Sequence, residues 1–419
     1  MTVKYSVPRG TYDILPKESH KWEYIDKIFR QVAKNYGYQE IVTPIFEHSE
    51  VFERSVGDTS DIIQKEMYRF EDKKGRTFAL RPEGTAPVIR SFVENNMWVE
   101  SSITKLFYVG PMFRYDRPQA GRSRQFSQFG IECIGSNHPY YDAEVIAVFY
   151  NFLHKLGLKH FKVEINSIGC PECSEIYNQV LKDYYKTIFN ELCNDCKLRY
   201  DKNPKRLLDC KVESCSRFSK NAPSMLDYLD EKCQNHFDEV KKYLDILKIP
   251  YVVNPTIVRG LDYYSQTAFE FINTNLGSQN ALGGGGRYNG LIQQMGGKET
   301  PAIGFAGGFS RILLSLDQEG INIDNNKKAK FYLVRFGDTV LANAIQLINY
   351  LREHDIFVGF DIEKTSLKAQ MKMADRLNAE YAIIIGDDEL ENNLLTIKNL
   401  KSGEHTTISL DQPDKLLEL

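Results

Sequence analysis

Residues 113–132 of this 419-residue chain read FRYDRPQAGRSRQFSQFGIE. Two β-rich runs, 103–115 and 124–135, flank the polar loop YDRPQAGRS, which contains glycine and proline. This pattern predicts two antiparallel strands joined by a long loop. In a chain whose net charge is -3, the stretch is notably basic, because it contains Arg114, Arg117, Arg122 and Arg124.

The positions of these arginines indicate a site for an anion. Arg114 follows the apolar run GPMF, so we expect its guanidinium at the edge of a sheet over a cleft, where its fixed fork suits a phosphate. Phe126 and Phe129 offer flat apolar faces on which an adenine ring could stack. A nucleotide fits both features, although on composition alone solvated surface charge explains the arginines equally well.

The rest of the first 325 residues continues the β-rich pattern. A helix is predicted over 20–38, ending at Gly37, and the strand QEIVTPIFE that follows is broken by Pro44. Two more β-rich runs, DYYSQTAFEFI and SQNALGGGGRY, precede FAGGFSRILLSLD (305–317), which is predicted as a glycine-led helix. Strands outnumber the helices between them, which favours a largely antiparallel sheet.

Two parts of the chain differ from this pattern. Lysine, cysteine and helical periodicity predict an inserted helical subdomain over about 168–245. After about residue 325, FYLVRF, a helix, IFVGFDI, the helix SLKAQMKMADRLN and YAIIIG alternate, as in an α/β unit with parallel strands. Because 419 residues are too many for one ordinary core, we expect a first domain over 1–325 and a second over 329–419.

Composition excludes few classes of protein. The net charge decides little about nucleic-acid binding, which depends on where the Lys and Arg side chains lie. No stretch of the sequence is a continuous apolar run long enough for a secretion signal or a membrane span. We therefore expect a cytoplasmic protein with no membrane partner.

Two further stretches have both a structural and a functional interpretation. In LRPEGTAPVIR (80–90), Glu83 could bind an amine, but capping the helix that starts near Thr85 is the favoured role. The stretch LGGGGRYNGLI lacks the Gly-Lys-Ser/Thr of a phosphate-binding loop, so close backbone packing explains its glycines equally well.

The stretch VRGLDYYSQTAFEF (258–271) is predicted as a strand that begins at Arg259. Alternate residues of a strand face opposite sides, so Tyr263 and Tyr264 are expected to point in opposite directions, one of them into the core.

Cysteines are concentrated in the predicted insert: seven of the eight fall within 64 residues, and Cys133 stands apart. Without an export signal, bound metal or reduced thiols are favoured over disulfides. The helical pattern between the cysteine pairs favours reduced, small apolar residues. Two C-x₂-C pairs separated by 19 residues nevertheless suit one tetrahedral structural zinc site made of Cys170, Cys173, Cys193 and Cys196, with Cys210 and Cys215 as alternative ligands for the second pair.

Taken together, these motifs resemble histidyl-tRNA synthetases, a family of class II aminoacyl-tRNA synthetases, over nearly the whole chain. They are, in the family's order, PRGTYDILP, TPIFE (motif 1), FRYDRPQAGRSRQF with QFGIE (motif 2), VRGLDYY, GGGRYNGL and GFAGGFSRIL (motif 3). The resemblance implies an α+β catalytic domain of the class II synthetase fold, built on a largely antiparallel sheet with the helical insert. A C-terminal α/β anticodon-binding domain would follow it.

The resemblance implies the activity of a histidine–tRNA ligase. This family joins L-histidine to ATP as histidyl-adenylate, releases pyrophosphate, and passes the histidyl group to the 3′ end of tRNA(His). By matching positions, Arg259 and Arg114 are the catalytic residues, at the α-phosphate. ATP, which is expected with Mg²⁺, would contact Arg114, Arg122, Phe126 and Arg311.

The same resemblance implies how L-histidine is bound. Glu83, Thr85 and Gln128 would surround its α-amino group, and Glu132 and Tyr264 would contact the imidazole nitrogens. Such a site leaves its own polar groups unpaired with other amino acids, so roughly 10⁴-fold discrimination is expected without an editing domain. The full set of matching positions is Glu83, Gly84, Thr85, Arg114, Gln128, Glu132, Arg259, Tyr263 and Tyr264.

The chain departs from the family's motifs at four positions. Ser310 replaces an acidic residue in motif 3, and Asp116, Ala120 and Ser123 stand in motif 2 where Glu, Lys and Tyr are common. The alternative function is a non-catalytic paralogue that acts as a regulatory or tRNA-sensing subunit. The expected partners are tRNA(His), L-histidine, ATP and a second copy of the chain in a homodimer, with no DNA.

Overall fold

The structure is a computed structural model that describes residues 4–56, 62–119, 121–210, 212–261, 263–277, 280–325 and 328–419. It divides into two compact units, Met1–Ile323 and Asp324–Leu419, each with its own hydrophobic core. Within the described ranges, no helix has the length and apolar character needed to cross a membrane.

The larger unit is built on an eight-stranded sheet. Its strands are β1 (Gln39–Glu40), β5 (Thr104–Phe113), β6 (Gln125–Ile134), β7 (Phe161–Ser167), β8 (Tyr251–Val253), β9 (Ser265–Asn273), β10 (Ala281–Arg287) and β11 (Ala302–Gly308). They lie in the order β1-β5-β6-β11-β10-β9-β7-β8. The two edge pairs are parallel and the five inner pairs are antiparallel, so the expected largely antiparallel sheet is confirmed.

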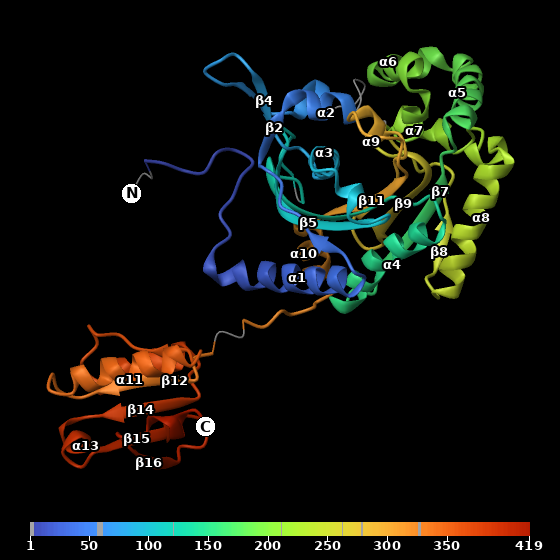
Figure 1. The fold of residues 1–419 in the computed structure, drawn as a ribbon. Helices are drawn as coiled ribbons and strands as arrows, with labels where there is room; N and C mark the ends of the chain where they lie inside the picture. The colour runs from blue at the N-terminus through green and yellow to red at the C-terminus, as the bar shows by residue number, and fades with distance from the viewer. Residues whose placement is uncertain are drawn as a thin grey trace. The chain divides into compact units, whose positions relative to one another are not determined.

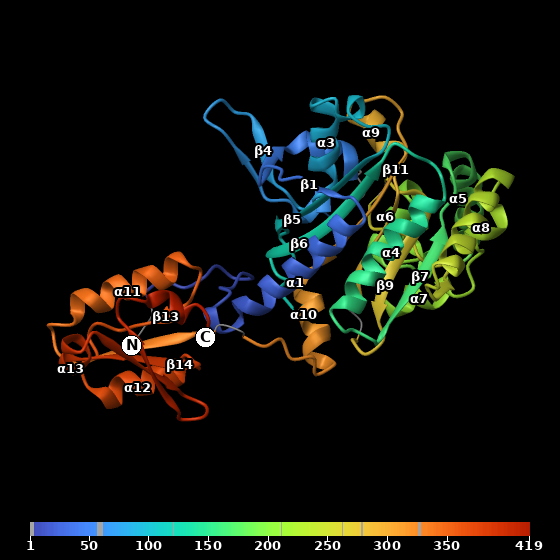
Figure 2. The same cartoon turned by 60° about the horizontal axis from the view of Figure 1, so that its bottom comes forward.

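Helices cover both faces of this sheet (Figures 1 and 2). On one face lie α1 (Pro16–Asn35), α4 (Tyr140–Lys155) and α10 (Phe309–Gln318), and on the other α2 (Ser49–Val56), α3 (Thr85–Glu94) and α9 (Leu291–Gln294). The helix predicted over 20–38 is α1, which begins four residues earlier, at Pro16. Short helical turns η1 (Ile62–Glu66) and η2 (Met97–Val99) complete the connections.

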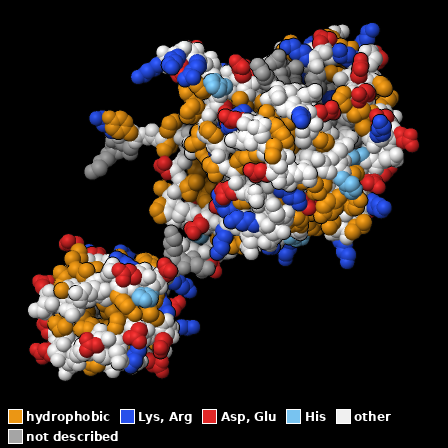
Figure 3. Space-filling view, viewed as in Figure 1, with side chains coloured by type: hydrophobic (Ala, Val, Ile, Leu, Met, Phe, Trp, Pro, Cys, Tyr) orange, Lys and Arg blue, Asp and Glu red, His pale blue; other side chains and the backbone are white. Residues whose placement is uncertain are grey.

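A separate three-stranded sheet projects from the larger unit. It consists of β2 (Phe46–His48), β3 (Arg69–Glu71) and β4 (Thr77–Leu80), in the order β2-β4-β3. The predicted break at Pro44 is confirmed, because the residues before it join the large sheet and those after it join the small one. Val42 is 80% exposed, and Ile45 and Phe46 are also exposed. Figure 3 shows hydrophobic side chains gathered on this side of the unit.

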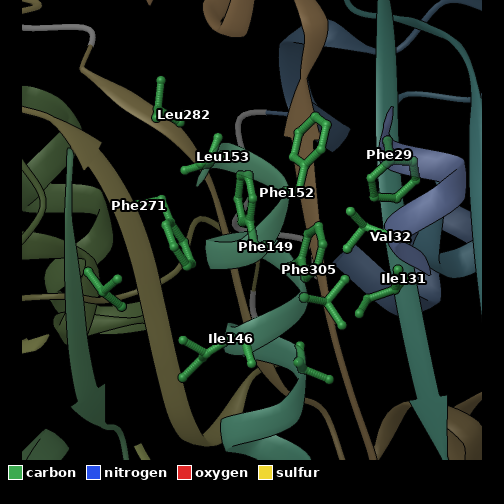
Figure 4. Close-up of a cluster of buried hydrophobic side chains, with 14 of the residues drawn as sticks. Phe29, Val32, Ile131, Ile146, Phe149, Phe152, Leu153, Phe271, Leu282 and Phe305 are labelled. Carbon is green, nitrogen blue, oxygen red and sulfur yellow. The ribbon is translucent and has the colours of Figure 1, made fainter. Parts of the chain in front are cut away.

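An aromatic core fills the space between the large sheet and the helices α1 and α4 (Figure 4). The ring of Phe29 in α1 lies 4.7 Å from that of Phe129 in β6, and Phe149 in α4 stacks on Phe305 in β11 at 4.7 Å. Because side chains alternate along a strand, the residues between these aromatics face the opposite side of the sheet.

The run 305–317 is a strand and then a helix, so its prediction as a helix throughout was wrong. Residues up to Gly308 belong to β11 and pair with β6, and the helix α10 starts at Phe309. The glycines permit close packing here, since a Cβ on Gly307 would lie 2.4 Å from the ring of Phe129.

The insert is helical, as predicted, and has a core of its own. Its helices are α5 (Pro171–Lys186), α6 (Asn194–Lys202), α7 (Glu213–Ser219) and α8 (Glu231–Ile246), with the turns η3 (Phe189–Glu191), η4 (Pro204–Leu207) and η5 (Met225–Tyr228). Helix α8 also packs on α4, where Asp142 accepts hydrogen bonds from His236 of α8 (3.2 Å) and from the fully buried Arg287 of β10.

The smaller unit has a five-stranded sheet in the order β13-β12-β14-β15-β16. Helices α11 (Leu341–Glu353) and α12 (Leu367–Arg376) pack on it, and α13 (Asp387–Glu391) and η6 (Pro413–Leu416) are shorter. The predicted parallel strands are confirmed for β12 (Phe331–Arg335), β13 (Val358–Gly359) and β14 (Tyr381–Ile385). The remaining strands, β15 (Leu394–Asn399) and β16 (His405–Ser409), are antiparallel.

Candidate active site

A cavity of about 320 Å³ opens in the larger unit. The strands line it with Phe126 and Gln128 of β6, Glu270 of β9 and Ala306 of β11. The last three each have a sequence neighbour in the aromatic core. The cavity therefore lies on the face of the sheet away from that core. It brings together most of the candidates from the sequence: Glu83, Thr85, Arg114, Arg122, Phe126, Gln128, Arg259, Tyr263, Tyr264 and Arg311.

Three arginines crowd one another in this cavity. Burial lowers the pKa of Arg311, and the positive charges of Arg122 and Arg114 lower it further. Burial also lowers the pKa of Arg114; the carboxylates of Glu66 and Glu83 oppose that shift, and Arg122 adds to it. An anion bound between these guanidinium groups would relieve their repulsion. The cavity thus has the electrostatics of a phosphate site.

Backbone carbonyls hold two of these guanidinium groups in place. Arg114 donates from Nε to the carbonyl of Pro82 at 2.8 Å, and Arg311 donates from Nη1 to the carbonyl of Ala281 at 2.7 Å. Each bond uses one nitrogen of its guanidinium group and fixes the position of that group in the cavity wall.

The other two arginines of the loop do not line the cavity. Arg117 is exposed, and the guanidinium carbon of Arg124 lies 3.8 Å from the ring centroid of Tyr115. Of the four arginines in residues 113–132, Arg114 and Arg122 therefore line the cavity, while Arg117 and Arg124 do not. Ala120, one of the departures from the family's motif, lies outside the described residues.

Of the two phenylalanines proposed to stack on adenine, only one lies at the cavity. Phe126 lines the cavity, with the guanidinium carbon of Arg114 5.4 Å from its ring centroid. Phe129 is fully buried in the aromatic core, so its proposed contact with a nucleotide was wrong. The reason is strand geometry, because residues three apart in a strand face opposite sides of the sheet.

Arg259 is fixed by an acidic partner that the sequence did not single out. Its Nη1 donates to Oε1 of Glu270 in β9, and its guanidinium carbon lies 5.6 Å from the ring centroid of Tyr264. Burial alone would lower the pKa of Arg259, but the charge of Glu270 raises it above the usual value. The guanidinium therefore stays charged inside the cavity.

Tyr263 and Tyr264 do not lie on opposite faces of a strand, and that prediction was wrong. Strand β9 begins at Ser265, after both tyrosines, and the backbone before it turns. Their ring centroids are 4.6 Å apart and both side chains line the cavity. The turn frees them from strand alternation and places two hydroxyl-bearing rings at one site.

Glu83 caps the helix α3, as predicted, and lines the cavity as well. Its Oε2 accepts from the backbone N–H of Thr85 at 2.7 Å and its Oε1 from that of Ala86 at 2.8 Å. Burial raises the pKa of Glu83, and these two hydrogen bonds partly oppose the shift. Gly84, beside it, donates its N–H to Oε1 of Gln128 at 3.1 Å.

Glu132 lies fully buried behind the cavity wall. Its Oε2 accepts from the hydroxyl of Tyr288, while its Oε1 has no hydrogen-bond partner among the described residues. Burial raises its pKa to about 8, against the opposing effects of the Tyr288 bond and of the Thr85 hydroxyl. A carboxyl with a free buried oxygen is costly in a folded protein, which is typical of a group kept to bind a ligand.

The chain is similar to known proteins over nearly its whole length. The sequence profile of histidyl-tRNA synthetases matches residues 10–183 and 208–312, and that of the anticodon binding domain matches residues 323–418. The chain belongs to the histidyl-tRNA synthetase family. It is 52% identical over 403 residues to a histidine–tRNA ligase of Halothermothrix orenii, which covers 96% of each chain.

Two further relatives agree with this assignment. A histidine–tRNA ligase of Caldanaerobacter subterraneus is 48% identical over 411 residues, which is 98% of this chain and 99% of that one. The crystal structure of apo S. aureus histidyl-tRNA synthetase matches with a TM-score of 0.84 at 41% identity, over 98% of this chain and 99% of that chain.

The cysteines do not form the single four-cysteine site expected from the two C-x₂-C pairs, and that grouping was wrong. Each pair belongs to a different group. The four-cysteine group contains Cys193, Cys196, Cys210 and Cys215, and the Asp230 group contains Cys170, Cys173, Asp230 and Cys233. Cys210 and Cys215, which the sequence offered as alternative ligands for the second pair, lie in the same group as that pair.

Several residues that shape this site were not predicted from the sequence. Glu66 and Glu270 line the cavity, and Tyr288 holds Glu132. Glu270 stands in an apolar strand, where a lone acidic residue facing away from the core is a usable signal. Tyr288 lies two residues after the glycine-rich run, but nothing local to it indicates a contact with Glu132, 156 positions away.

The raised pKa of Glu132 predicts a pH-dependent loss of stability that Glu132→Gln removes. Between the usual glutamate value of 4.5 and about 8, the folded protein holds a proton that the unfolded chain has lost. The wild-type free energy of unfolding should therefore fall with rising pH in this window, by at most about 1.4 kcal/mol per unit from this group.

Urea denaturation of both proteins from pH 5 to pH 9 tests this. The stability of the wild type should decline relative to Glu132→Gln up to about pH 8. A difference that stays constant between pH 5 and pH 8 would contradict the buried, protonated carboxyl.

Proposed function

We propose that this protein is a histidine–tRNA ligase, which activates L-histidine with ATP to histidyl-adenylate and then transfers histidine to the 3′ end of tRNA(His). The observation that carries the proposal is one cavity that combines crowded arginines, suited to phosphates, with the Glu83, Tyr263 and Tyr264 side chains, suited to an amino acid. Relatives named histidine–tRNA ligase that match nearly the whole chain support it. The expected location is the cytoplasm, where charged tRNA is used.

In the first step, an oxygen of the histidine carboxylate bonds to the α-phosphorus of ATP, and the bond from that phosphorus to the bridging oxygen breaks. Pyrophosphate leaves with the electron pair. The attacking carboxylate is already ionised at neutral pH, so the step needs positioning and charge stabilisation rather than a base. Arg114 and Arg259, both fixed by hydrogen bonds, are the residues proposed to stabilise the charge on the α-phosphate.

The remaining nucleotide contacts follow the charges of the cavity. Phe126 would stack on adenine, Arg311 would lie over the nucleotide, and Arg122 would meet the terminal phosphate after leaving Asp116, to which it now donates at 3.0 Å. The carboxylates of Glu66, Asp116 and Glu270 line the same cavity and suit Mg²⁺ that enters with ATP. Such an ion neutralises phosphate charge when bound.

Histidine recognition is proposed to rest on buried polar groups. Glu83, Thr85 and Gln128 would surround the α-amino group, and each oxygen of Glu83 keeps a lone pair beyond the helix cap. The unpartnered oxygen of Glu132 and the hydroxyl of Tyr264 would bond the imidazole nitrogens. Another amino acid would leave these groups unpaired, which costs it roughly 10⁴-fold in specificity.

The alternative, a non-catalytic paralogue, has less support. A subunit that senses or regulates would need none of Arg114, Arg259 and Arg311 in one cavity, yet all three line it. Ser310, which replaces the acidic residue of motif 3, also lines this cavity, and its hydroxyl lies 3.2 Å from that of Tyr12.

Arg259→Ala is the sharpest test of the chemistry. Loss of this charge should lower histidine-dependent exchange of pyrophosphate into ATP by at least about 10²-fold, the usual effect of removing one transition-state donor. Arg117→Ala, which removes an exposed arginine outside the cavity, is the matched control and should retain exchange. Near-normal exchange by folded Arg259→Ala would remove Arg259 from the mechanism, and no exchange by the wild type would favour the paralogue.

A homodimer is proposed from motif 1 and from the apolar surface beside it. Val42, Ile45 and Phe46 are exposed next to the small sheet, and a patch of this kind is typical of a protein interface. A second copy of the chain is the proposed occupant, since motif 1 serves the subunit interface in related enzymes.

Sedimentation velocity at assay concentration should therefore show a dimer of the 48.3 kDa chain. The double variant Val42→Glu and Ile45→Glu should dissociate it, because two charges cannot be buried unpaired. Leu198→Glu, on an exposed apolar residue of the insert, should leave the dimer intact. An active wild-type monomer is the contrary result.

The smaller unit is proposed to bind the anticodon end of tRNA(His). The match of residues 323–418 to the anticodon binding domain supports this role. Protein that ends at Ile323 should keep histidine-dependent pyrophosphate exchange, because the cavity lies wholly in the larger unit. Its charging of intact tRNA(His) should fall tenfold or more, since loss of only about 1.4 kcal/mol of binding has that effect.

An acceptor-stem RNA without the anticodon arm is the control substrate, which both proteins should charge equally. Equal charging of intact tRNA by the shortened and the full-length protein would refute the assignment.

A further inference from the structure

The seven cysteines of the insert and one aspartate form two compact groups of four. In each group, one ligand atom from every member lies within 4.8 Å of all the others. No cysteine between 170 and 233 is left outside a group. Cysteines that served only as small apolar residues would have no reason to converge in fours, so the arrangement itself calls for an explanation.

The four-cysteine group has the geometry of a tetrahedral metal site. Sulfurs bound to zinc at about 2.3 Å lie about 3.8 Å apart, and the sulfurs of Cys193 and Cys210 are 3.9 Å apart. Cys193 precedes α6, Cys196 lies in its first turn, Cys210 follows η4, and Cys215 lies in α7. The backbone N–H of Cys193 also donates to the sulfur of Cys215 at 3.1 Å, as it would to a thiolate.

The Asp230 group consists of two similar halves, each made of a helix N-cap residue and a cysteine three residues later. Cys170 is the N-cap of α5 and Cys173 is three residues on; Asp230 is the N-cap of α8 and Cys233 is three residues on. Each cap accepts from the backbone N–H of its partner, at 3.4 Å for Cys170 and 2.7 Å for Asp230. Two helix N-termini therefore point at the group, which favours negative charge there.

The two halves of the Asp230 group meet closely. The sulfur of Cys170 lies 3.4 Å from that of Cys173 and 3.4 Å from Oδ2 of Asp230, and the N–H of Asp230 donates to the sulfur of Cys173 at 3.2 Å. All eight cysteines of the chain are free thiols. The spacing suits one ion held by three thiolates and a carboxylate, and it is too tight for a cluster of several iron atoms.

We propose that each group binds one zinc ion, so that the insert carries two structural zinc sites per chain. Each site offers four protein ligands, which closes a tetrahedral ion and leaves no position for substrate. The four-cysteine site ties α6, η4 and α7 together, and the Asp230 site ties the start of α5 to the start of α8. Two of the ligands, Cys193 and Cys196, fall in residues 184–207, outside the match to the family profile.

Metal analysis of the full-length protein, purified without chelator or a metal-affinity step, tests the proposal directly. We expect two equivalents of zinc per chain. X-ray absorption at the zinc edge should report an average shell of 3.5 sulfurs and 0.5 oxygen, since seven thiolates and one carboxylate are shared by two ions. One equivalent, iron in place of zinc, or less than a tenth of an equivalent would each overturn it.

Variants assign the two ions to their groups. Cys215→Ser and Cys233→Ser should each reduce zinc to one equivalent, and Cys133→Ser, which changes the cysteine outside both groups, should keep two. Asp230→Asn retains an oxygen that can cap α8 but removes the charge. Its second zinc should therefore be lost to a chelator concentration that leaves the wild type loaded.

Asp230→Cys should restore tight binding of that second zinc as a fourth thiolate. If Asp230→Asn held two zinc ions as tightly as the wild type, Asp230 would not be a ligand and the second site would be refuted. Should a cysteine variant fail to fold, the metal content and absorption spectrum of the wild type still decide the proposal.

Discussion

The alternation of side chains along the inner strands is the constraint on which this structure depends. In β6, Phe129 and Ile131 enter the aromatic core while Gln128 and Glu132 face the other side. The same strand thus builds the core with one set of residues and the site with the other. Because a shift by one residue would exchange the two sets, the packing of the aromatic rings also fixes the register of the binding residues.

The cavity formed this way is balanced in charge before any ligand enters. Arginines and carboxylates line it in equal number, since Glu66, Glu83, Asp116 and Glu270 stand among Arg114, Arg122, Arg259 and Arg311. An uncompensated set of four cations around one cavity would be costly, and the carboxylates offset that cost. A nucleotide with its cation brings both signs of charge, so it can replace ion pairs such as that of Arg122 with Asp116 without leaving either partner alone.

The sequence was enough to predict the sheet, the strand pair around the arginine loop, the cap by Glu83 and the helical insert, because periodicity and local hydrogen bonding determine them. The predictions that were wrong concern residues whose positions depend on a turn or on a contact with a distant part of the chain. Tyr263 and Tyr264 lie before their strand rather than in it, and Phe129 faces the core rather than the site. Cysteine spacing identified both C-x₂-C pairs but could not pair Cys170 with Asp230, 60 positions away, because that contact depends on how α5 and α8 pack.

Hydrogen bonds and apolar contacts join the insert to the residues around Arg259. Arg206 of η4 donates to the carbonyl of Gly260 at 2.7 Å, next to Arg259, and Val258 is part of the insert's core. On the other side, Gln266 exchanges backbone hydrogen bonds with Ile168 and Gly169, just before Cys170. Gln266 has a φ of 50°, which a residue other than glycine adopts only when its surroundings hold it there. Residues on both sides of Tyr263 and Tyr264 are therefore held by hydrogen bonds to elements that adjoin the two cysteine groups, so the fold of the insert is linked to the placement of Arg259 and these tyrosines.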